Sequence, residues 1–151
     1  MKIDRNFEMV ETNGVRLRTV VEGKGPLVIL LHGWPQCWYL WRHQIDPLVE
    51  AGFKVAVPDQ RGFGGSDRPP AIADYNIRTL AADIAGIARA LGHDGFRLIG
   101  HDWGCVVAWN TALLHEETCQ QAEAEKERRC LAVREPKFRV DVPGVSFQRF
   151  A

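Results

Sequence analysis

The residues best suited to chemistry stand at positions 100–104, which read Gly-His-Asp-Trp-Gly. A mainly apolar stretch, 96–99, precedes them, and another, 105–109, follows. A strand, a sharp turn and a helix, with small residues two before and two after the central residue, are typical of a nucleophile elbow. The central residue here is Asp102, and a carboxylate is already a nucleophile at neutral pH, unlike a serine hydroxyl. Taken alone, the same pattern also fits a helix for which Asp102 is only the N-cap.

A second motif, His-Gly-Trp-Pro, follows the apolar run 27–31. A loop at this place supplies one oxyanion-hole N–H in hydrolases with such an elbow, and the residue after the nucleophile supplies the other. We expect these donors to be the backbone amides of Trp34 and Trp103. Loss of one such donor typically costs roughly 3–4 kcal/mol in the transition state. By itself the motif is equally compatible with a tight turn. The candidate substrate-binding residues of this loop are His32, Gly33, Trp34 and Pro35.

A third motif, at 58–69, is rich in glycine but does not predict a nucleotide site. It lacks the Lys-Ser/Thr pair of a P-loop and the spacing of a dinucleotide fingerprint. We expect Asp59, Arg61 and Asp67 to fix the loop by hydrogen bonds rather than to perform chemistry.

The elements that must position these motifs alternate along the chain. Segments 7–12 and 15–21 alternate apolar with polar residues around Asn-Gly, which predicts a hairpin. Continuous apolar runs at 27–31, 54–58 and 96–100 are typical of buried parallel strands. An apolar stripe at helical spacing over 77–91 ends at a glycine. Trp38, Trp41 and Ile45 also recur at helical spacing, and Asp46-Pro47 then predicts a new helix start. The pattern indicates an α/β fold with a mostly parallel sheet, whose active sites lie beyond the carboxyl ends of the strands.

Composition describes a globular chain with no charge bias. Its 151 residues are 46% hydrophobic and 25% charged, and Lys plus Arg equals Asp plus Glu at 19 each. We therefore expect neither nucleic acid nor an anionic membrane as a partner. No signal-peptide pattern opens the chain and no apolar run is long enough for a bilayer, so we expect a cytoplasmic protein with reduced cysteines. No metal or cofactor pattern is present, and we expect neither.

Together the three motifs resemble the α/β-hydrolase superfamily, and specifically its epoxide hydrolase branch. The matching residues are 32–36 (His-Gly-Trp-Pro-Gln), 59–66 (Asp-Gln-Arg-Gly-Phe-Gly-Gly-Ser) and 100–104, in order and in spacing. The resemblance covers roughly residues 7–115. Haloalkane dehalogenases are related and usually place Asn at the position of Trp34, so Trp34 favours the epoxide hydrolases.

The resemblance implies that Asp102 attacks a ring carbon of a small apolar epoxide and forms an alkyl-enzyme ester. A histidine-activated water would then attack the ester carbonyl and release a vicinal diol. Trp38, Trp103 and Trp109 are candidates to line an apolar pocket, and for Trp109 we favour a place in the core instead. Two alternatives stay open: a C–halogen hydrolase, which would release halide, and a non-catalytic fragment.

The sequence departs from the family pattern in its second half. In the family the catalytic histidine follows the last strand of a longer chain, and a lid domain carries two tyrosines that protonate the epoxide oxygen. We therefore expect residues 1–115 to be the N-terminal part of the core, without lid or C-terminal half, and 116–151 to be a divergent charged tail. Within that tail, 116–129 predicts a solvated helix or disorder and 130–133 a short strand. The histidines are His32, His43, His93, His101 and His115, and none stands at the position of the family's base.

Overall fold

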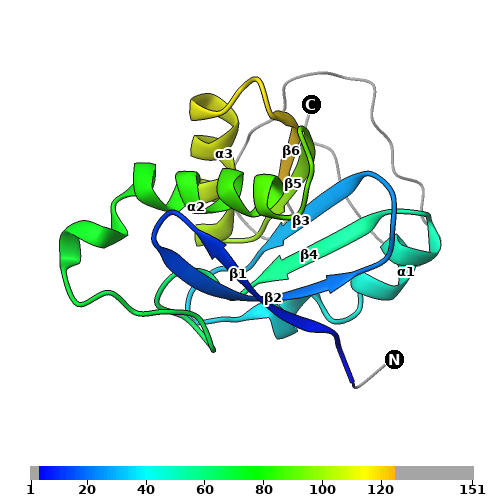
Figure 1. The fold of residues 1–151 in the computed structure, drawn as a ribbon, viewed down its shortest axis with the longest axis horizontal. Helices are drawn as coiled ribbons and strands as arrows, with labels where there is room; N and C mark the ends of the chain where they lie inside the picture. The colour runs from blue at the N-terminus through cyan, green and yellow to red at the C-terminus, as the bar shows by residue number, and fades with distance from the viewer. Residues whose placement is uncertain (1–3, 125–151) are drawn as a thin grey trace.

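The computed structural model describes residues 4–124 of the chain, and the side chains of residues 4–119. Its helices lie on both sides of one twisted sheet (Figure 1). The elements, in chain order, are β1 (Phe7–Thr12), β2 (Val15–Glu22), β3 (Leu27–Leu31), η1 (Trp38–Trp41), α1 (Ile45–Glu50), β4 (Lys54–Pro58), η2 (Ile72–Tyr75), α2 (Ile77–Ala90), β5 (Phe96–Gly100), α3 (Trp103–Leu114) and β6 (Cys119–Ala124).

The six-stranded sheet has the order β1-β2-β4-β3-β5-β6. The pairs β1/β2 and β2/β4 are antiparallel, whereas β3 pairs in parallel with both β4 and β5, and β5 pairs in parallel with β6. The predicted hairpin and mostly parallel sheet are therefore confirmed. Because β3 and β5 are parallel neighbours, the loops that follow them emerge side by side, and these loops carry the first and second motifs.

The hairpin turn has the backbone that its sequence predicts. Asn13 and Gly14 both have positive φ, 45° and 77°. Two successive residues of this kind form the turn whose twist matches that of paired strands. The turn also contacts α2, because Nδ2 of Asn13 donates to Oδ1 of Asp83 over 2.8 Å. The hairpin is thereby joined to the helix layer.

Buried side chains divide between the two faces of the sheet. Alternate residues of a strand point to opposite faces. Leu27, Ile29 and Leu31 of β3 pack with α2 and α3 on one face, and Val28 and Leu30 pack with η1 and α1 on the other. This three-layer arrangement explains why β3 is continuously apolar, since both of its faces are covered.

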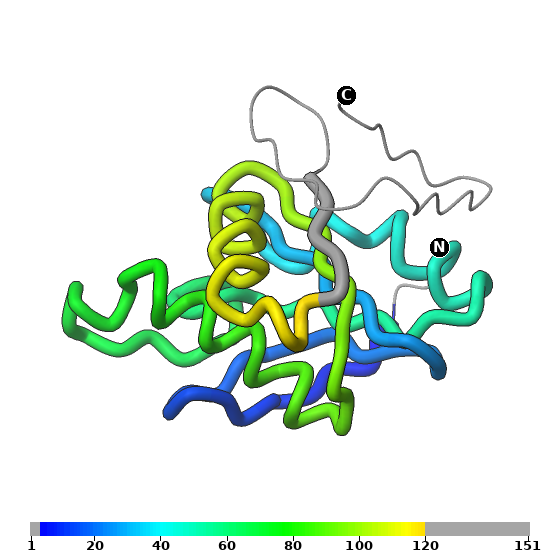
Figure 2. The backbone as a smooth tube through the Cα atoms, turned by 90° about the horizontal axis from the view of Figure 1, so that it is seen from above, coloured from blue at the N-terminus to red at the C-terminus, as the bar shows by residue number. Residues whose placement is uncertain are grey.

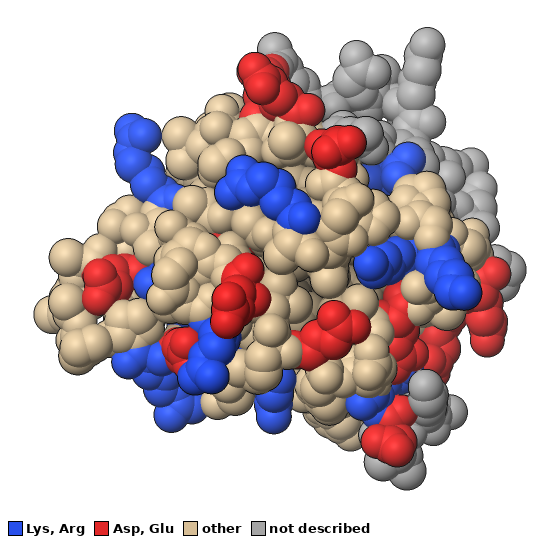
Figure 3. All heavy atoms as spheres, in the orientation of Figure 1, with Lys and Arg blue, Asp and Glu red and all other residues tan. Residues whose placement is uncertain are grey.

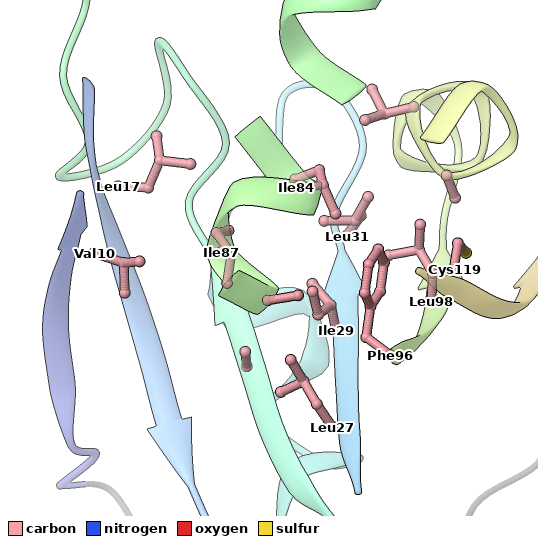
Figure 4. Packing of buried hydrophobic residues seen from close by; sticks show 14 of the residues in the cluster. Val10, Leu17, Leu27, Ile29, Leu31, Ile84, Ile87, Phe96, Leu98 and Cys119 are labelled. Atoms are coloured by element: carbon pink, nitrogen blue, oxygen red, sulfur yellow. The ribbon is translucent and has the colours of Figure 1, made fainter. Parts of the chain in front are cut away.

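Helix α2 covers the first of these faces along its predicted stripe. Ile84 and Ile87 belong to the buried cluster that also contains Ile29, Leu31 and Phe96 (Figure 4). The helix begins at Asn76, whose side chain accepts a hydrogen bond from the backbone N–H of Thr79. It ends before Gly92, which has φ 78°. Seen from above, α2 and α3 lie next to each other (Figure 2).

The segment after β3 differs in detail from the helical prediction. Residues 38–41 form a 3-10 turn, and α1 begins at Ile45, just ahead of the predicted start at Asp46-Pro47. Pro47 lies in the first turn of α1, where its missing N–H leaves no helical hydrogen bond unmade.

The prediction of a helix or disorder over 116–129 is wrong for its first part. Residues Cys119–Ala124 form strand β6, which pairs with β5 in the register Phe96↔Cys119. The backbone N–H of Phe96 donates to the carbonyl of Thr118 over 3.0 Å, at the start of this ladder. The open edge of β5 presents unpaired backbone N–H and C=O groups, which favour pairing with another strand. The charge pattern of residues 116–129 gives no information about that edge. The sheet thus continues past the predicted boundary at 115. Residues 125–133 lie outside the described residues.

On the face of the molecule seen in Figure 3, the described basic and acidic side chains are interspersed, so that face has no large patch of one charge. Among the described residues no helix has both the length and the apolar character that a membrane span requires.

Candidate active site

The loops after β3 and β5 meet at the carboxyl end of the sheet. The register pairs Leu31 with Gly100, and the backbone N–H of His101 donates to the carbonyl of Leu31 over 3.0 Å. The chain then turns sharply at Asp102 into α3. Two motifs far apart in the sequence are thereby brought into one site, as predicted for this kind of sheet.

Asp102 has a backbone conformation that side chains rarely adopt. Its φ is 52° and its ψ is −123°. Such conformations persist only where the surroundings enforce them, and they are concentrated at functional sites. The flanking glycines are part of that enforcement. A Cβ on Gly100 would collide with the carbonyl of Gly104, and a Cβ on Gly104 would collide with the carbonyl of Leu31.

The Asp102 carboxylate faces the loop after β3. The backbone N–H of Trp34 donates to its Oδ2 over 3.0 Å. Backbone hydrogen bonds from Trp103 and then from Trp34 lower the pKa of Asp102 below its ordinary value. Asp102 makes no side-chain hydrogen bond as a helix cap, so its carboxylate faces the loop after β3 rather than capping α3. The two tryptophan amides named from the sequence are those that contact it.

Position 33, beside this carboxylate, accommodates only glycine. A Cβ built on Gly33 would lie 2.5 Å from both the Cβ and the Oδ2 of Asp102. Next in the chain, the Trp34–Pro35 peptide bond is cis, and both of these residues are exposed. The loop therefore approaches Asp102 by its backbone and leaves the side chains of Trp34 and Pro35 on the surface.

His32 lies behind the site rather than in it. Its side chain is fully buried, its Nδ1 lies 2.8 Å from the carbonyl of Gly33, and the N–H of Gln60 donates to its Nε2 over 3.0 Å. A carbonyl only accepts and a backbone N–H only donates, so Nδ1 carries the proton and Nε2 does not. Burial lowers the pKa of His32, in keeping with this neutral form. The expectation that His32 binds substrate is therefore corrected: it positions the loop.

Gln36 is a site residue to which the sequence analysis assigned no role. Its Oε1 accepts the backbone N–H of Gly33 over 3.1 Å and lies 3.1 Å from Nδ1 of His101. Its only signal in the sequence is its place directly after the His-Gly-Trp-Pro motif. That signal is weak, because the contact joins residues 65 positions apart.

The third motif fixes the loops around the site, as predicted. Asp59 is fully buried and accepts hydrogen bonds from the N–H of Trp38, the N–H of Gly65 and Nε of Arg18. Arg61 pairs with Asp83 of α2, with both side chains almost completely buried. Asp67 accepts the backbone N–H of Arg16.

The two tryptophans whose amides face Asp102 have exposed indole rings, Trp34 at 66% and Trp103 at 61%. Trp109, further along α3, is 40% exposed. The prediction that Trp109 packs in the core is therefore wrong. Buried residues of α3 such as Gly104, Val107 and Thr111 lie on the side of the helix away from Trp109. Cys105, in the first turn of α3, is also buried.

Two histidines lie at the opposite end of the sheet. His93 shortly precedes the first residue of β5, whereas Asp102 follows its last. His115 caps the far end of α3, next to the turn that starts β6. Within residues 4–124 no group of three or more His, Cys, Asp or Glu side chains is arranged to hold a metal ion.

The arrangement of strand, strained Asp102 and following helix has known counterparts. Residues 26–122 match the family described as the alpha/beta hydrolase fold. The chain belongs to that family. Within the alpha/beta hydrolase fold family it is 52% identical over 111 residues to epoxide hydrolase A of Mycobacterium tuberculosis, covering 72% of this chain and 34% of that protein. It is 46% identical over 112 residues to the AB hydrolase superfamily protein YfhM of Bacillus subtilis, covering 73% of this chain and 39% of that protein.

Solved alpha/beta hydrolase structures superpose on most of the described fold. The crystal structure of epoxide hydrolase A from Mycobacterium thermoresistibile has a TM-score of 0.78 at 48% identity, covering 80% of this chain and 39% of that one. Epoxide hydrolase VrEH1 from Vigna radiata has a TM-score of 0.79 at 36% identity, covering 89% and 43%. The match is to the N-terminal part of these structures. This chain thus spans only about two fifths of their length.

Proposed function

We propose that this chain carries the nucleophile half-site of an epoxide hydrolase, with Asp102 as the nucleophile. The observation that carries the proposal is the hydrogen bond of 3.0 Å from the Trp34 N–H to Oδ2 of Asp102, at a turn with φ 52°. Similarity to epoxide hydrolases over the same residues supports it. The elbow presents the carboxylate that would form the ester. The two backbone N–H donors beside it would stabilise the oxyanion that forms when water attacks that ester.

In the first step a carboxylate oxygen of Asp102 attacks a ring carbon of the epoxide. The new C–O bond is an ester, the ring C–O bond breaks, and the ring oxygen takes its electron pair and then a proton from water. The lowered pKa of Asp102 supports this step, because the nucleophile is ionised throughout the neutral range. The exposed indole rings of Trp34 and Trp103 favour a small apolar substrate at this position.

In the second step water attacks the carboxyl carbon of the ester. Negative charge then develops on the carboxyl oxygen that the amides of Trp34 and Trp103 face, and these donors stabilise it without moving. The tetrahedral intermediate collapses with cleavage of the bond between the carboxyl carbon and the alkyl oxygen, which takes up a proton, so the diol leaves and the carboxylate is restored. The step also requires a base to accept a proton from the water. His32 has both ring nitrogens engaged, and His93 and His115 lie at the far end of the sheet. His101 follows β5 beside the site, but its Nδ1 faces Gln36, and among the described residues its ring makes no hydrogen bond to Asp102. We infer that the isolated chain forms the ester on Asp102 slowly, if at all, and does not turn it over.

Intact-mass spectrometry of the full chain with styrene oxide tests the proposal. The expected product is one adduct of the mass of a single epoxide, located on Asp102 by peptide mapping and absent from Asp102→Asn. A folded chain that gives no adduct at Asp102 would mean a non-catalytic fragment. Halide release from a haloalkane without epoxide adduct would indicate C–halogen chemistry instead. Rapid diol production over many turnovers would show that a base is present after all.

A further inference from the structure

Gln36 stands between the two loops that form the candidate site. Its Oε1 is 3.1 Å from the backbone nitrogen of Gly33 and 3.1 Å from Nδ1 of His101. Its own backbone N–H donates to the carbonyl of Gly33 over 3.1 Å. The side-chain oxygen of Gln36 thus contacts both the loop after β3 and the loop after β5. Gln36 is itself held to Gly33 by one side-chain and one backbone hydrogen bond.

The chemistry of these contacts determines the protonation of His101. A backbone N–H only donates, so the Gln36 atom that faces Gly33 must be the amide oxygen and not the nitrogen. That oxygen only accepts, so Nδ1 of neutral His101 must carry the proton and Nε2 must hold the lone pair. The orientation of the amide and the tautomer of the imidazole therefore both follow from one backbone donor.

These contacts form a closed ring around the Asp102 carboxylate. From Gln36 the ring passes through His101 to Asp102, across the 3.0 Å hydrogen bond to Trp34, and back through Gly33. Each loop is therefore held to the other on both sides of the reacting group. Rotation of the Gly33–Trp34 peptide away from Asp102 would also break the hydrogen bond from the backbone N–H of Gln36 to the carbonyl of Gly33, while the Gln36 side chain holds the preceding peptide through the Gly33 N–H.

We propose that Gln36 is a positioning residue for Asp102 and for the Trp34 oxyanion donor, an inference that rests on the proposed function. A neutral amide suits this place, because it accepts from two donors without adding a second negative charge beside the Asp102 carboxylate. Leucine would supply the volume but no acceptor, whereas glutamate would supply the acceptor together with a charge.

The first test reads the ring directly by ¹⁵N NMR of the full chain. In the wild type His101 is expected to show the Nδ1–H tautomer. Gln36→Leu is expected to shift it toward Nε2–H and to move the amide proton of Trp34, whereas Gln36→Glu keeps the Nδ1–H. Gln44→Leu is the matched control, since Oε1 of Gln44 has no hydrogen-bond partner among the described residues. An Nε2–H tautomer in the wild type would overturn the inference, even if Gln36→Leu did not fold.

The second test measures the rate of ester formation on Asp102 with styrene oxide. We expect Gln36→Leu to lower it by about tenfold or more, because small errors in placement are costly in rate. Gln36→Glu should recover most of the rate and Gln44→Leu should leave it unchanged. Equal rates and equal tautomers in Gln36→Leu and wild type would refute the positioning role. Absence of any adduct in the wild type would instead refute the proposed function, and the NMR result would still decide whether the ring exists.

Discussion

A side-chain carbon on Gly33 would lie 2.5 Å from Oδ2 of Asp102, so the carboxylate occupies space that only glycine leaves open. The two residues belong to different loops and meet only because β3 and β5 are parallel neighbours. The Trp34 amide binds Oδ2 of Asp102, and the carboxylate fills the space that a side chain at position 33 would occupy. This relationship makes the site sensitive to changes as small as one methyl group.

Gly33→Ala is expected to abolish ester formation on Asp102 while the chain still folds. The added methyl must displace the carboxylate or the loop, at a cost of about 1–3 kcal/mol in the free energy of unfolding. Urea unfolding and adduct mass spectrometry measure the two effects separately. Gly14→Ala is the control for a loss of stability alone, because its φ of 77° strains an alanine in the hairpin turn, away from Asp102, although no atom lies within 4 Å of the new Cβ. This variant should lose stability and keep ester formation. Adduct formation at the wild-type rate in Gly33→Ala would contradict the geometry described above.

The rate of ester formation is expected to be independent of pH between about pH 4.5 and about pH 7. The pKa of Asp102 is lowered by the backbone N–H groups of Trp103 and Trp34, so the carboxylate stays ionised below the ordinary aspartate value. The rate should fall only as the pH drops through that lowered pKa, and the same protonation removes the contribution of Asp102 to stability. ¹³C NMR of the carboxyl carbon checks this directly. An inflection above the ordinary aspartate value would show that the amides do not bind the carboxylate.

His32 is expected to make the fold less stable below about pH 6.5, the ordinary histidine value. Burial lowers the pKa of His32 in the folded chain, so the unfolded chain binds the proton first as the pH falls. The stabilisation is complete above the unfolded value and is lost as the pH falls through the folded value, by at most about 1.4 kcal/mol per pH unit.

Urea unfolding of wild type and His32→Gln at several pH values measures that slope. The glutamine variant keeps a donor and an acceptor but cannot titrate, so its slope should be smaller. His93→Gln is the comparison, because the pKa of half-buried His93 is also lowered, by burial and then by Lys54. If the two variants reduce the slope equally, the burial of His32 has no special effect on stability.

The buried ion pair between Arg61 and Asp83 is expected to contribute far more to the free energy of unfolding than the exposed pair between Arg16 and Asp67. The two side chains are 5% and 2% exposed and their charged atoms lie 2.8 Å apart. Arg61→Met leaves the Asp83 carboxylate buried without its cation and should cost about 3–5 kcal/mol. Replacing both residues, by Met and Leu, should recover part of that loss.

Arg16→Met tests the exposed pair that Arg16 forms with Asp67 over 3.3 Å. Such pairs gain little, because water and salt screen them. The change in the midpoint of urea unfolding should therefore be much smaller than for Arg61→Met. Equal midpoints for the two variants would mean that burial does not set the strength of the Arg61 pair.

The local sequence by itself determined the hairpin, three parallel strands and α2. Asn13-Gly14 supplies a turn that few other pairs permit, and continuous apolar runs such as 27–31 have no stable place except between two helix layers. Asp102 and the amides of Trp34 and Trp103 could be named from the sequence only by combining motifs, because each local pattern by itself also fits a helix cap or a tight turn.

Tertiary structure alone decided the partners of these residues. Strand β6 forms because the edge of β5 is open, His32 is buried and neutral because Gln60 and Gly33 occupy its two nitrogens, and Gln36 contacts His101 because two parallel strands end together. Trp109 is exposed because α3 turns its other side to the sheet. Each of these outcomes depends on contacts with residues elsewhere in the chain. The local pattern of residues does not specify which hydrogen-bond partner a side chain meets or which side of a helix packs on the sheet.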